Sequence, residues 1–189
     1  MPAPDHAADR VRPALQWRVG QGVSAIDRAV PDEAPVALSY DGEAHVVLMA
    51  TPRDVEDLAL GFTLTERIAA AAQVRLIVAQ PREEGVAVDI LLAPGAGHAA
   101  RARTLEGRSS CGLCGVQHLK SAVRPLPEVG EGLRIGRGAI QVALAALEDE
   151  QALGRLTRAT HAAAWADAGG RLHLVREDVG RHNALDKLV

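Results

Sequence analysis

Apolar and polar positions alternate with two different periods along the first half of the chain, and these periods predict its elements. Val36–Ser39 and Ala44–Met49 are apolar stretches on either side of a Tyr-Asp-Gly-Glu turn, which is typical of a β-hairpin. Thr51 and Pro52 resemble an N-cap followed by a first helical residue, and apolar side chains then recur at helical spacing to about Arg67. Val74–Gln80 and Val86–Leu92 predict two further strands joined by a turn.

The second half of the chain predicts a loop, three helices and a strand pair. Small and polar residues in 109–115 indicate a loop, and a short helix is expected over Val116–Val123 before a connector rich in Pro and Gly, 126–138. Strong helix formers then fill Ala139–Leu153, and the face expected to be buried carries four apolar residues: Ile140, Ala143, Leu144 and Leu147. Thr160–Trp165 and Leu172–Val175 are expected to pair. A last helix should begin around Asp178–Gly180, with Ala184, Leu185, Leu188 and Val189 on one side.

The loop Ser-Ser-Cys-Gly-Leu-Cys-Gly contains both cysteines of the chain, Cys111 and Cys114. Glycines beside the thiols allow a tight turn that exposes sulfur. A helix beginning near Val116 would direct its N-terminal N–H groups at the loop, and this position lowers a thiol pKa and favours the nucleophilic thiolate. These features are what a sulfur carrier needs, because an accessible thiolate must take sulfur from a donor and release it again.

Other interpretations of the cysteine pair remain open. Cys111 and Cys114 could form half of a structural zinc site, which His118 and His161 would have to complete because no second C-x-x-C is present. They could also form a thioredoxin-like dithiol, although that motif usually follows a strand in a βαβ unit. Inert buried thiols are a third interpretation, which the glycine-rich loop disfavours.

A second polar cluster lies between the last predicted strand and the last helix, where α/β proteins gather ligand-binding groups. Its side chains offer charge and directional donors to a pyrophosphate or a purine edge, and the candidate binding residues are Arg176, Asp178, Arg181, His182 and Asn183. The same segment could instead be a capped helix start, with Asp178 as the N-cap. His161 is interpreted as an ordinary strand histidine.

Composition excludes several classes of function. The 189 residues include 48% hydrophobic and 24% charged side chains, as in an ordinary globular protein. A net charge of -3 and 2% aromatic residues give no general attraction to nucleic acid and little material for stacking bases. No apolar run approaches the roughly 20 residues of a membrane-spanning helix. The start carries no secretory signal, so a cytoplasmic location is expected, with reduced thiols.

The motifs together resemble the FdhD family of formate dehydrogenase accessory sulfurtransferases. Residues 109–115 are similar to its cysteine loop, and Arg176–Leu188, reading REDVGRHNALDKL, is similar to its most distinctive segment. Thr51-Pro52 with Glu56–Phe62 and Thr65-Glu66 is similar to its N-terminal helix. These three separated motifs occur in one order between Ala34 and Val189.

The resemblance implies a function. Members accept persulfide sulfur from a cysteine desulfurase and pass it to the bis(molybdopterin guanine dinucleotide) molybdenum cofactor for formate dehydrogenase. Cys111 would be the sulfur carrier and Cys114 its partner. The cofactor would be a bound substrate, no permanently bound metal is expected, and the protein would be a homodimer. The alternatives are a non-catalytic cofactor-binding chaperone and a zinc or redox dithiol protein.

The resemblance also implies a fold. The expected architecture is α/β, with a β-rich N-terminal region carrying a long helix and an incomplete cytidine-deaminase-like domain after it. The deaminase zinc signature is missing near His182, so zinc-dependent deamination is not expected. The expected divisions are a disordered leader, 1–12; the β-rich region, 13–105; the cysteine loop, short helix and connector, 106–138; and the start of the last domain, 139–189.

Two positions depart from the family pattern where glycine is usual. Arg67 follows Glu66 in place of a glycine. Thr157–His161 reads TRATH where the family usually has Thr-Gly-Gly-x-His, so a glycine turn is expected to be missing.

Overall fold

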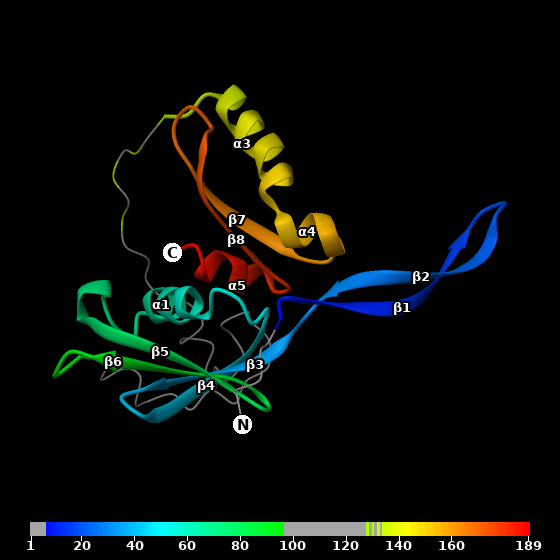
Figure 1. Cartoon of the computed structure of the whole chain (residues 1–189). Helices are drawn as coiled ribbons and strands as arrows, with labels where there is room; N and C mark the ends of the chain where they lie inside the picture. Colours follow the sequence, from blue (N-terminus) through cyan, green and yellow to red (C-terminus); the bar gives the residue numbers. More distant parts are fainter. Residues whose placement is uncertain (1–6, 97–127, 129, 131, 133) are drawn as a thin grey trace, which may run out of the picture.

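The structure, a computed structural model, describes residues 7–96, 128, 130, 132 and 134–189. It is a mixed α/β molecule in which a four-stranded sheet with helix α1 forms one part and a strand pair with helices α3, α4 and α5 forms the other (Figure 1). A long two-stranded ribbon projects from the side. Cys111, Cys114, the expected helix Val116–Val123 and part of the expected connector lie outside the described residues.

The four-stranded sheet has the order β4-β3-β6-β5. The predicted hairpins are confirmed as β3 (Ala34–Tyr40) with β4 (Glu43–Ala50) and β5 (Val74–Arg82) with β6 (Gly85–Leu92), both antiparallel. β3 and β6 pair in parallel at the centre. Because side chains alternate along a strand, the apolar positions of these strands share one face and form the core beneath α1.

Helix α1 begins later and ends earlier than predicted. It spans Val55–Thr65, and its N-cap is Asp54 in the left-handed conformation, without a side-chain capping hydrogen bond. The predicted N-cap was wrong because Thr51 is used in other contacts, described below. The predicted apolar face is confirmed, since Val55, Leu58, Ala59 and Phe62 are all buried against the sheet.

The predicted helix 139–153 is two helices, α3 (Arg137–Glu150) and α4 (Ala152–Thr157), separated at Gln151. The predicted buried face of α3 was partly wrong. Ile140 and Leu144 are 51% and 63% exposed, and no residue of α3 is fully buried, because the helix packs only lightly on the strand pair.

The strand pair and last helix are confirmed with small shifts in their bounds. β7 (His161–Ala166) pairs antiparallel with β8 (Leu172–Asp178), and α5 (Arg181–Asp186) follows. Ala184 and Leu188 are buried as expected, but Leu185 and Val189 are 52% and 50% exposed, because only one side of α5 meets the rest of the chain.

Helix α5 packs directly on α1 and joins the two parts of the molecule. A Cβ atom at Gly61 of α1 would overlap the backbone carbonyl of Asp186, so glycine permits this close approach. Thr65 Oγ1 donates a hydrogen bond of 3.0 Å to Asp186 Oδ1 in the same interface. Burial, opposed by this hydrogen bond, raises the pKa of Asp186 to about 6.

The projecting ribbon consists of β1 (Asp9–Arg18) and β2 (Gly22–Pro31) in antiparallel register. The predicted disordered leader, 1–12, was therefore wrong for Asp9–Arg12. These four residues pair with Arg28–Pro31, and Arg10 forms an ion pair of 2.6 Å with Asp32 at the base. Among the described residues no helix is long and apolar enough to cross a membrane.

Candidate functional site

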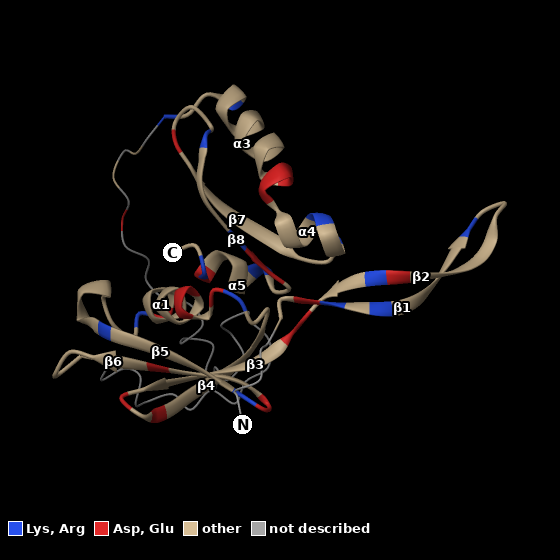
Figure 2. Ribbon diagram, in the orientation of Figure 1, with Lys and Arg blue, Asp and Glu red and all other residues tan. Residues whose placement is uncertain are grey.

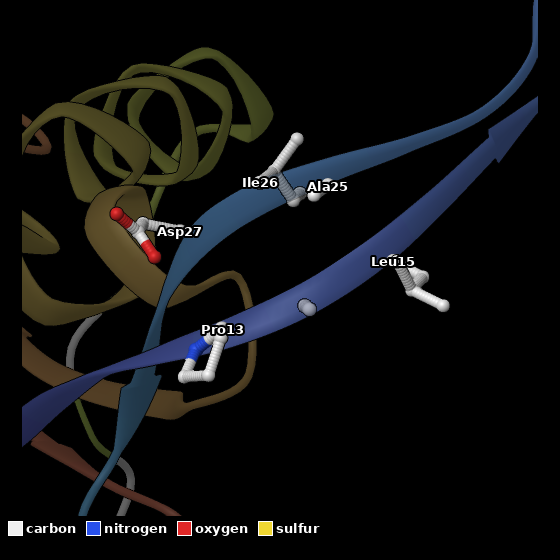
Figure 3. A pocket seen from close by; sticks show the side chains of 6 residues that line it. Pro13, Leu15, Ala25, Ile26 and Asp27 are labelled. Atoms are coloured by element: carbon white, nitrogen blue, oxygen red, sulfur yellow. The ribbon is translucent and has the colours of Figure 1, made fainter.

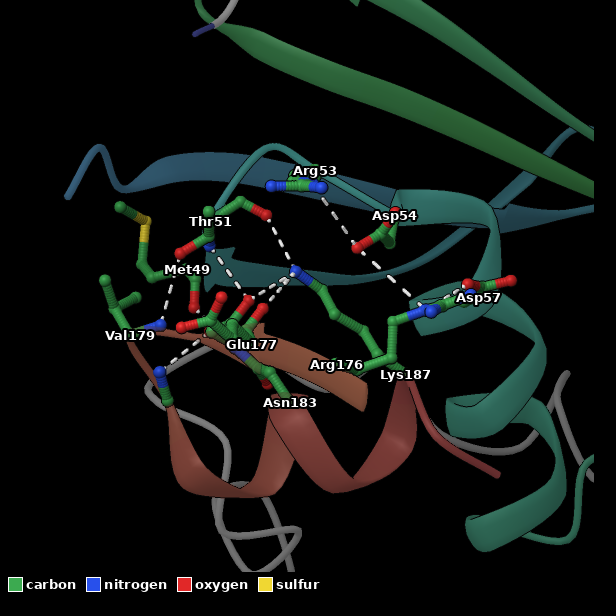
Figure 4. A network of polar contacts seen from close by, with 12 residues as sticks. Met49, Thr51, Arg53, Asp54, Asp57, Arg176, Glu177, Val179, Asn183 and Lys187 are labelled. Carbon is green, nitrogen blue, oxygen red and sulfur yellow. Dashed lines mark hydrogen bonds and ion pairs between the residues drawn. The ribbon is translucent and has the colours of Figure 1, made fainter. Parts of the chain in front are cut away.

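A buried ion pair lies where β8 turns into α5. Asp178 ends the strand, Lys187 follows the helix, and their Oδ2 and Nζ atoms are 2.7 Å apart (Figure 4). Both side chains are fully buried. Burial lowers the pKa of Lys187, and the Asp178 carboxylate opposes that shift. Such a pair is tolerated only when further hydrogen bonds satisfy both groups.

Asp178 receives three further hydrogen bonds. Its Oδ2 accepts from the backbone N of Thr51 at 3.0 Å, and its Oδ1 accepts from Gly180 N at 2.7 Å and Asn183 Nδ2 at 3.0 Å. The interpretation of Asp178 as the N-cap of α5 was wrong, because the N-cap residue is Gly180 and no side chain caps this helix. The Asp178 carboxylate instead accepts a hydrogen bond from the N–H of Gly180 itself and so holds the turn before the helix.

Thr51 binds the same turn from the other part of the molecule. Its Oγ1 accepts a hydrogen bond from Val179 N at 3.1 Å, and its carbonyl accepts one from Lys187 Nζ at 3.0 Å. Asn183 Nδ2 also donates to the carbonyl of Met49, one residue before the end of β4, at 2.9 Å. We call Thr51, Asp178, Asn183 and Lys187 the buried polar cluster. It fixes the β8–α5 turn against the β4–α1 connection.

Arg176 and Glu177 bind β8 to the two helices beside it, α1 and α4. Arg176 Nε lies 2.7 Å from Asp57 Oδ2 on α1, with its side chain 23% exposed. The Glu177 carboxylate accepts hydrogen bonds from the backbone N–H groups of Leu153 and Gly154 at 2.9 and 2.6 Å, which satisfies the start of α4. Most of the REDVGRHN segment is therefore occupied by contacts within the chain.

Arg181 and His182 differ from their neighbours in this segment. Arg181 is exposed and His182 is half-buried, and the side chain of neither residue forms a hydrogen bond or ion pair with any residue that the structure describes. They sit on the turn that the buried polar cluster fixes. Of the five candidate binding residues, these two have donors available to a ligand, whereas Arg176, Asp178 and Asn183 are engaged internally. Cofactor binding by all five stays a prediction.

The candidate residues of the cysteine loop cannot be placed against this turn, because Cys111, Cys114 and His118 lie outside the described residues. His161 is the first residue of β7 and lies opposite Asp178 in register, as expected for a strand histidine. No group of three or more possible metal ligands occurs among the described residues. The zinc interpretation depends on the cysteines and remains open.

Three structural residues of this site were not predicted: Thr51, Asp57 and Lys187. Thr51 has the sequence context of an N-cap, which concealed its role. Lys187 carried a weak signal, since it lies between the apolar residues Leu185 and Leu188. Asp57 carried none, because its partner is distant in the sequence.

Comparison with known proteins identifies the family. The model of the FdhD/NarQ family matches residues 31–189. The chain belongs to the FdhD/NarQ family. Among curated FdhD relatives, the chain is 45% identical over 192 residues to the "Sulfur carrier protein FdhD" of Bordetella petrii, covering 100% of this chain and 69% of the relative. It is also 45% identical over 182 residues to the protein of that name from Xanthomonas euvesicatoria, covering 95% and 64%.

A solved structure supports the fold of this FdhD/NarQ chain. The crystal structure of a candidate formate dehydrogenase accessory protein from Desulfotalea psychrophila matches with a TM-score of 0.71 and 21% identity, covering 96% of this chain and 67% of that one. The chain thus spans about two thirds of the length of its FdhD relatives.

Proposed function

We propose that this protein is a sulfur carrier that passes persulfide sulfur from a cysteine desulfurase to the bis(molybdopterin guanine dinucleotide) molybdenum cofactor, for use by formate dehydrogenase. The main support is the match to the FdhD/NarQ family across residues 31–189, which include the cysteine loop and the REDVGRHN segment. Relatives 45% identical over nearly the whole chain are named sulfur carrier proteins.

The proposed chemistry uses Cys111 as the carrier. Its thiolate attacks the outer sulfur of the desulfurase persulfide, a new S–S bond forms on Cys111, and the desulfurase cysteine leaves as a thiolate. The carried sulfur is then delivered to the cofactor. In the release step the Cys114 thiolate attacks the inner sulfur on Cys111, a Cys111–Cys114 disulfide forms, and the outer sulfur leaves as hydrosulfide for the cofactor. A thiol reductant then restores both cysteines.

The proposed binding half of the site is the β8–α5 turn. Arg181 offers a charged planar donor group that fits a pyrophosphate, and His182 offers a ring donor or acceptor for a phosphate or guanine edge. Asp178 and Asn183 support the cofactor site through the turn that they hold, and Arg176 supports it by tying β8 to α1. A rigid turn limits the entropy lost when the ligand binds.

We also propose that the region from α3 onward is the start of a cytidine-deaminase-like domain and that the reaction takes place in the cytoplasm. The order of helix, strand pair and helix in Arg137–Asp186 is what supports the fold proposal.

The experiment follows labelled sulfur. Cysteine labelled in its sulfur atom is incubated with a cysteine desulfurase, this protein and the cofactor. The cofactor is then separated, and the label that it carries is counted. Transfer of label by the parent chain and its loss in Cys111→Ala support the proposal. If the parent chain binds cofactor but passes no label, the chaperone alternative replaces it.

A further inference from the structure

A hollow lies along the middle of the β1–β2 ribbon (Figure 3). Its volume is about 440 Å³, which falls within the roughly 300–1,000 Å³ of pockets that bind small molecules. Three successive cross-strand pairs line it: Pro13 with Asp27, Ala14 with Ile26, and Leu15 with Ala25. Five of these six side chains are apolar and the sixth is a carboxylate. Such walls suit a flat ring that has polar groups along one edge.

The carboxylate of this hollow is available to a ligand. Asp27 is exposed, and its side chain forms no hydrogen bond or ion pair with any residue that the structure describes (Figure 3). An ionised carboxylate only accepts hydrogen bonds. Guanine presents two neighbouring donors, N1–H and the N2 amino group, which one carboxylate can accept together. Adenine has an acceptor at N1, so a carboxylate at the same place opposes it.

Two arginines follow the hollow toward the base of the ribbon. Arg12 and Arg28 form the next cross-strand pair, on the face that Ala14 also occupies. Figure 2 shows two blue positions opposite each other on the ribbon, with a red one next to them on β2. Like charges directly opposite each other destabilise an antiparallel pair. A diphosphate between the two guanidinium groups would relieve that repulsion and accept hydrogen bonds from both.

The base of the ribbon lies at the same end of the β7–β8 pair as the β8–α5 turn (Figure 1). The Arg28 guanidinium donates a hydrogen bond of 3.4 Å to the carbonyl of Thr157, at the end of α4. The chain then enters β7 at His161, which pairs with Asp178, the last residue of β8. The cofactor in the proposed function has two guanine dinucleotide arms, each with its own pyrophosphate. A protein that holds both arms needs two anion sites, and the turn with Arg181 offers one.

We propose that the hollow of the ribbon binds one guanine nucleotide arm of the cofactor, and that Asp27 selects guanine. The base lies against the apolar walls, its N–H groups donate to Asp27, and its diphosphate lies between Arg12 and Arg28. The β8–α5 turn then receives the other arm. This site rests on the proposed function for its natural ligand, but its binding of free GDP is measured without any sulfur transfer.

Titration calorimetry with GDP compares Arg12→Gln with Arg18→Gln. Both arginines are exposed on β1, but Arg12 lies beside the hollow, whereas Arg18 pairs with Gly22 at the outer end of the ribbon. We expect Arg12→Gln to weaken one class of GDP site at least tenfold, and Arg18→Gln to bind as the parent does. A parent chain that binds no GDP, or equal binding by the two variants, overturns the proposal. A parent that binds GDP in this way but passes no labelled sulfur supports the site and contradicts the proposed function.

Asp27→Asn distinguishes recognition of the base from damage to the fold. Asparagine keeps the size of the side chain but offers an amide donor, which fits xanthine, because xanthine has a carbonyl where guanine has its amino group. At the site that depends on Arg12, we expect the parent to prefer GDP and Asp27→Asn to bind xanthosine diphosphate at least tenfold more tightly than GDP. The melting temperature should not change. A variant that keeps the parent's preference for GDP overturns the proposal, since Asp27 then does not contact the base.

Discussion

A buried carboxylate is stable only when each of its lone pairs finds a donor, and Asp178 shows how the sequence meets this demand. Its donors come from its own turn, from Lys187 one helix later and from the distant backbone of Thr51. All buried side-chain nitrogens and oxygens in the described part of the chain have partners. Most of the REDVGRHN segment therefore stabilises the fold through contacts within the chain. Only Arg181 and His182 have side-chain donors available to a ligand.

Replacing Lys187 should destabilise the fold, because its buried ion pair with Asp178 is broken. Lys187→Met leaves the Asp178 charge buried without its counter-ion, so we expect the free energy of unfolding to fall by about 3–5 kcal/mol. Urea denaturation followed by circular dichroism measures it. In the control, adding Asp178→Asn to Lys187→Met should cost less than the sum of the two single changes. Strict additivity would show that the pair is not coupled.

Arg181→Ala should weaken ligand binding without changing stability. Losing one charge-assisted hydrogen bond costs roughly 1.5–3 kcal/mol, or about ten- to a hundred-fold in affinity for GDP or the cofactor. Because the Arg181 side chain forms no polar contact with a described residue, the melting temperature and persulfide formation should stay unchanged. Isothermal titration calorimetry measures the affinity. The matched control is Arg171→Ala, an exposed arginine at the other end of β8, which should bind as the parent does. Equal affinities for all three proteins would leave the turn as a helix cap only.

Two arginines occupy backbone conformations that favour glycine. Arg67 and Arg158 both have φ of 56°, and both are positions where the resemblance to the family implies a glycine. Residues 157–161 contain no glycine, but a left-handed turn is still formed there. Arg158 itself adopts the left-handed conformation that ends α4, and its N–H bonds the Gly154 carbonyl at 2.7 Å.

Arg158→Gly should therefore stabilise the protein. The left-handed conformation costs a residue with a side chain roughly 1–2 kcal/mol, partly offset by the greater freedom of glycine in the unfolded chain, so we expect a gain of up to about 1 kcal/mol. Arg155→Gly, in the helical part of α4, should lose about 1 kcal/mol. Thermal denaturation compares them. Destabilisation by both changes would contradict the assigned conformation of Arg158.

At the scale of elements, α1 and α5 form the main helix contact between the two parts of the molecule. Gly61 allows their backbones to approach, and Thr65 and Asp186 bond across the interface. In the buried polar cluster, Asp178 and Asn183 hold the start of α5, whereas Lys187 follows its last residue. The turn that carries Arg181 thus depends on both ends of one short helix.

Gly61→Ala should break this contact. Alanine is the better helix former, so by propensity alone the change would add about 1 kcal/mol of stability. A methyl group at Gly61 instead overlaps the Asp186 carbonyl, and we expect a loss of several kcal/mol, of the kind seen on overpacking. Gly138→Ala in α3 is the control, because nothing lies near its Cβ position, and it should be neutral or stabilising. Denaturant unfolding of both variants distinguishes them, and a stable Gly61→Ala protein would contradict the packing.

At the scale of the whole molecule, the sequence predicted local elements better than the contacts between them. The hairpins β3–β4, β5–β6 and β7–β8 were correct because alternation and turn residues are local signals. The inner face of α1 was correct for the same reason. Thr51, by contrast, was assigned to the helix that follows it, because its bonds to Asp178, Val179 and Lys187 join residues more than 120 positions apart.

The ribbon was missed for another reason. Charged residues among 1–12 resemble a solvated leader, but Asp9–Arg12 pair with Arg28–Pro31 as the start of β1. The candidate site was predicted as a segment, and the structure divides its residues into those that fasten the turn and those that are available to a ligand. That division could not be predicted, since it depends on where Thr51, Asp57 and Met49 lie.

Sulfur carried on Cys111 would raise the mass of the chain, and intact-mass analysis detects this change. The chain is incubated with a cysteine desulfurase and cysteine, and its mass is recorded before and after treatment with a reductant. We expect a gain of one sulfur atom in the parent chain and in Cys114→Ala, no gain in Cys111→Ala, and loss of the added mass on reduction. A parent chain that gains no sulfur, or sulfur found only on Cys114, would contradict the account.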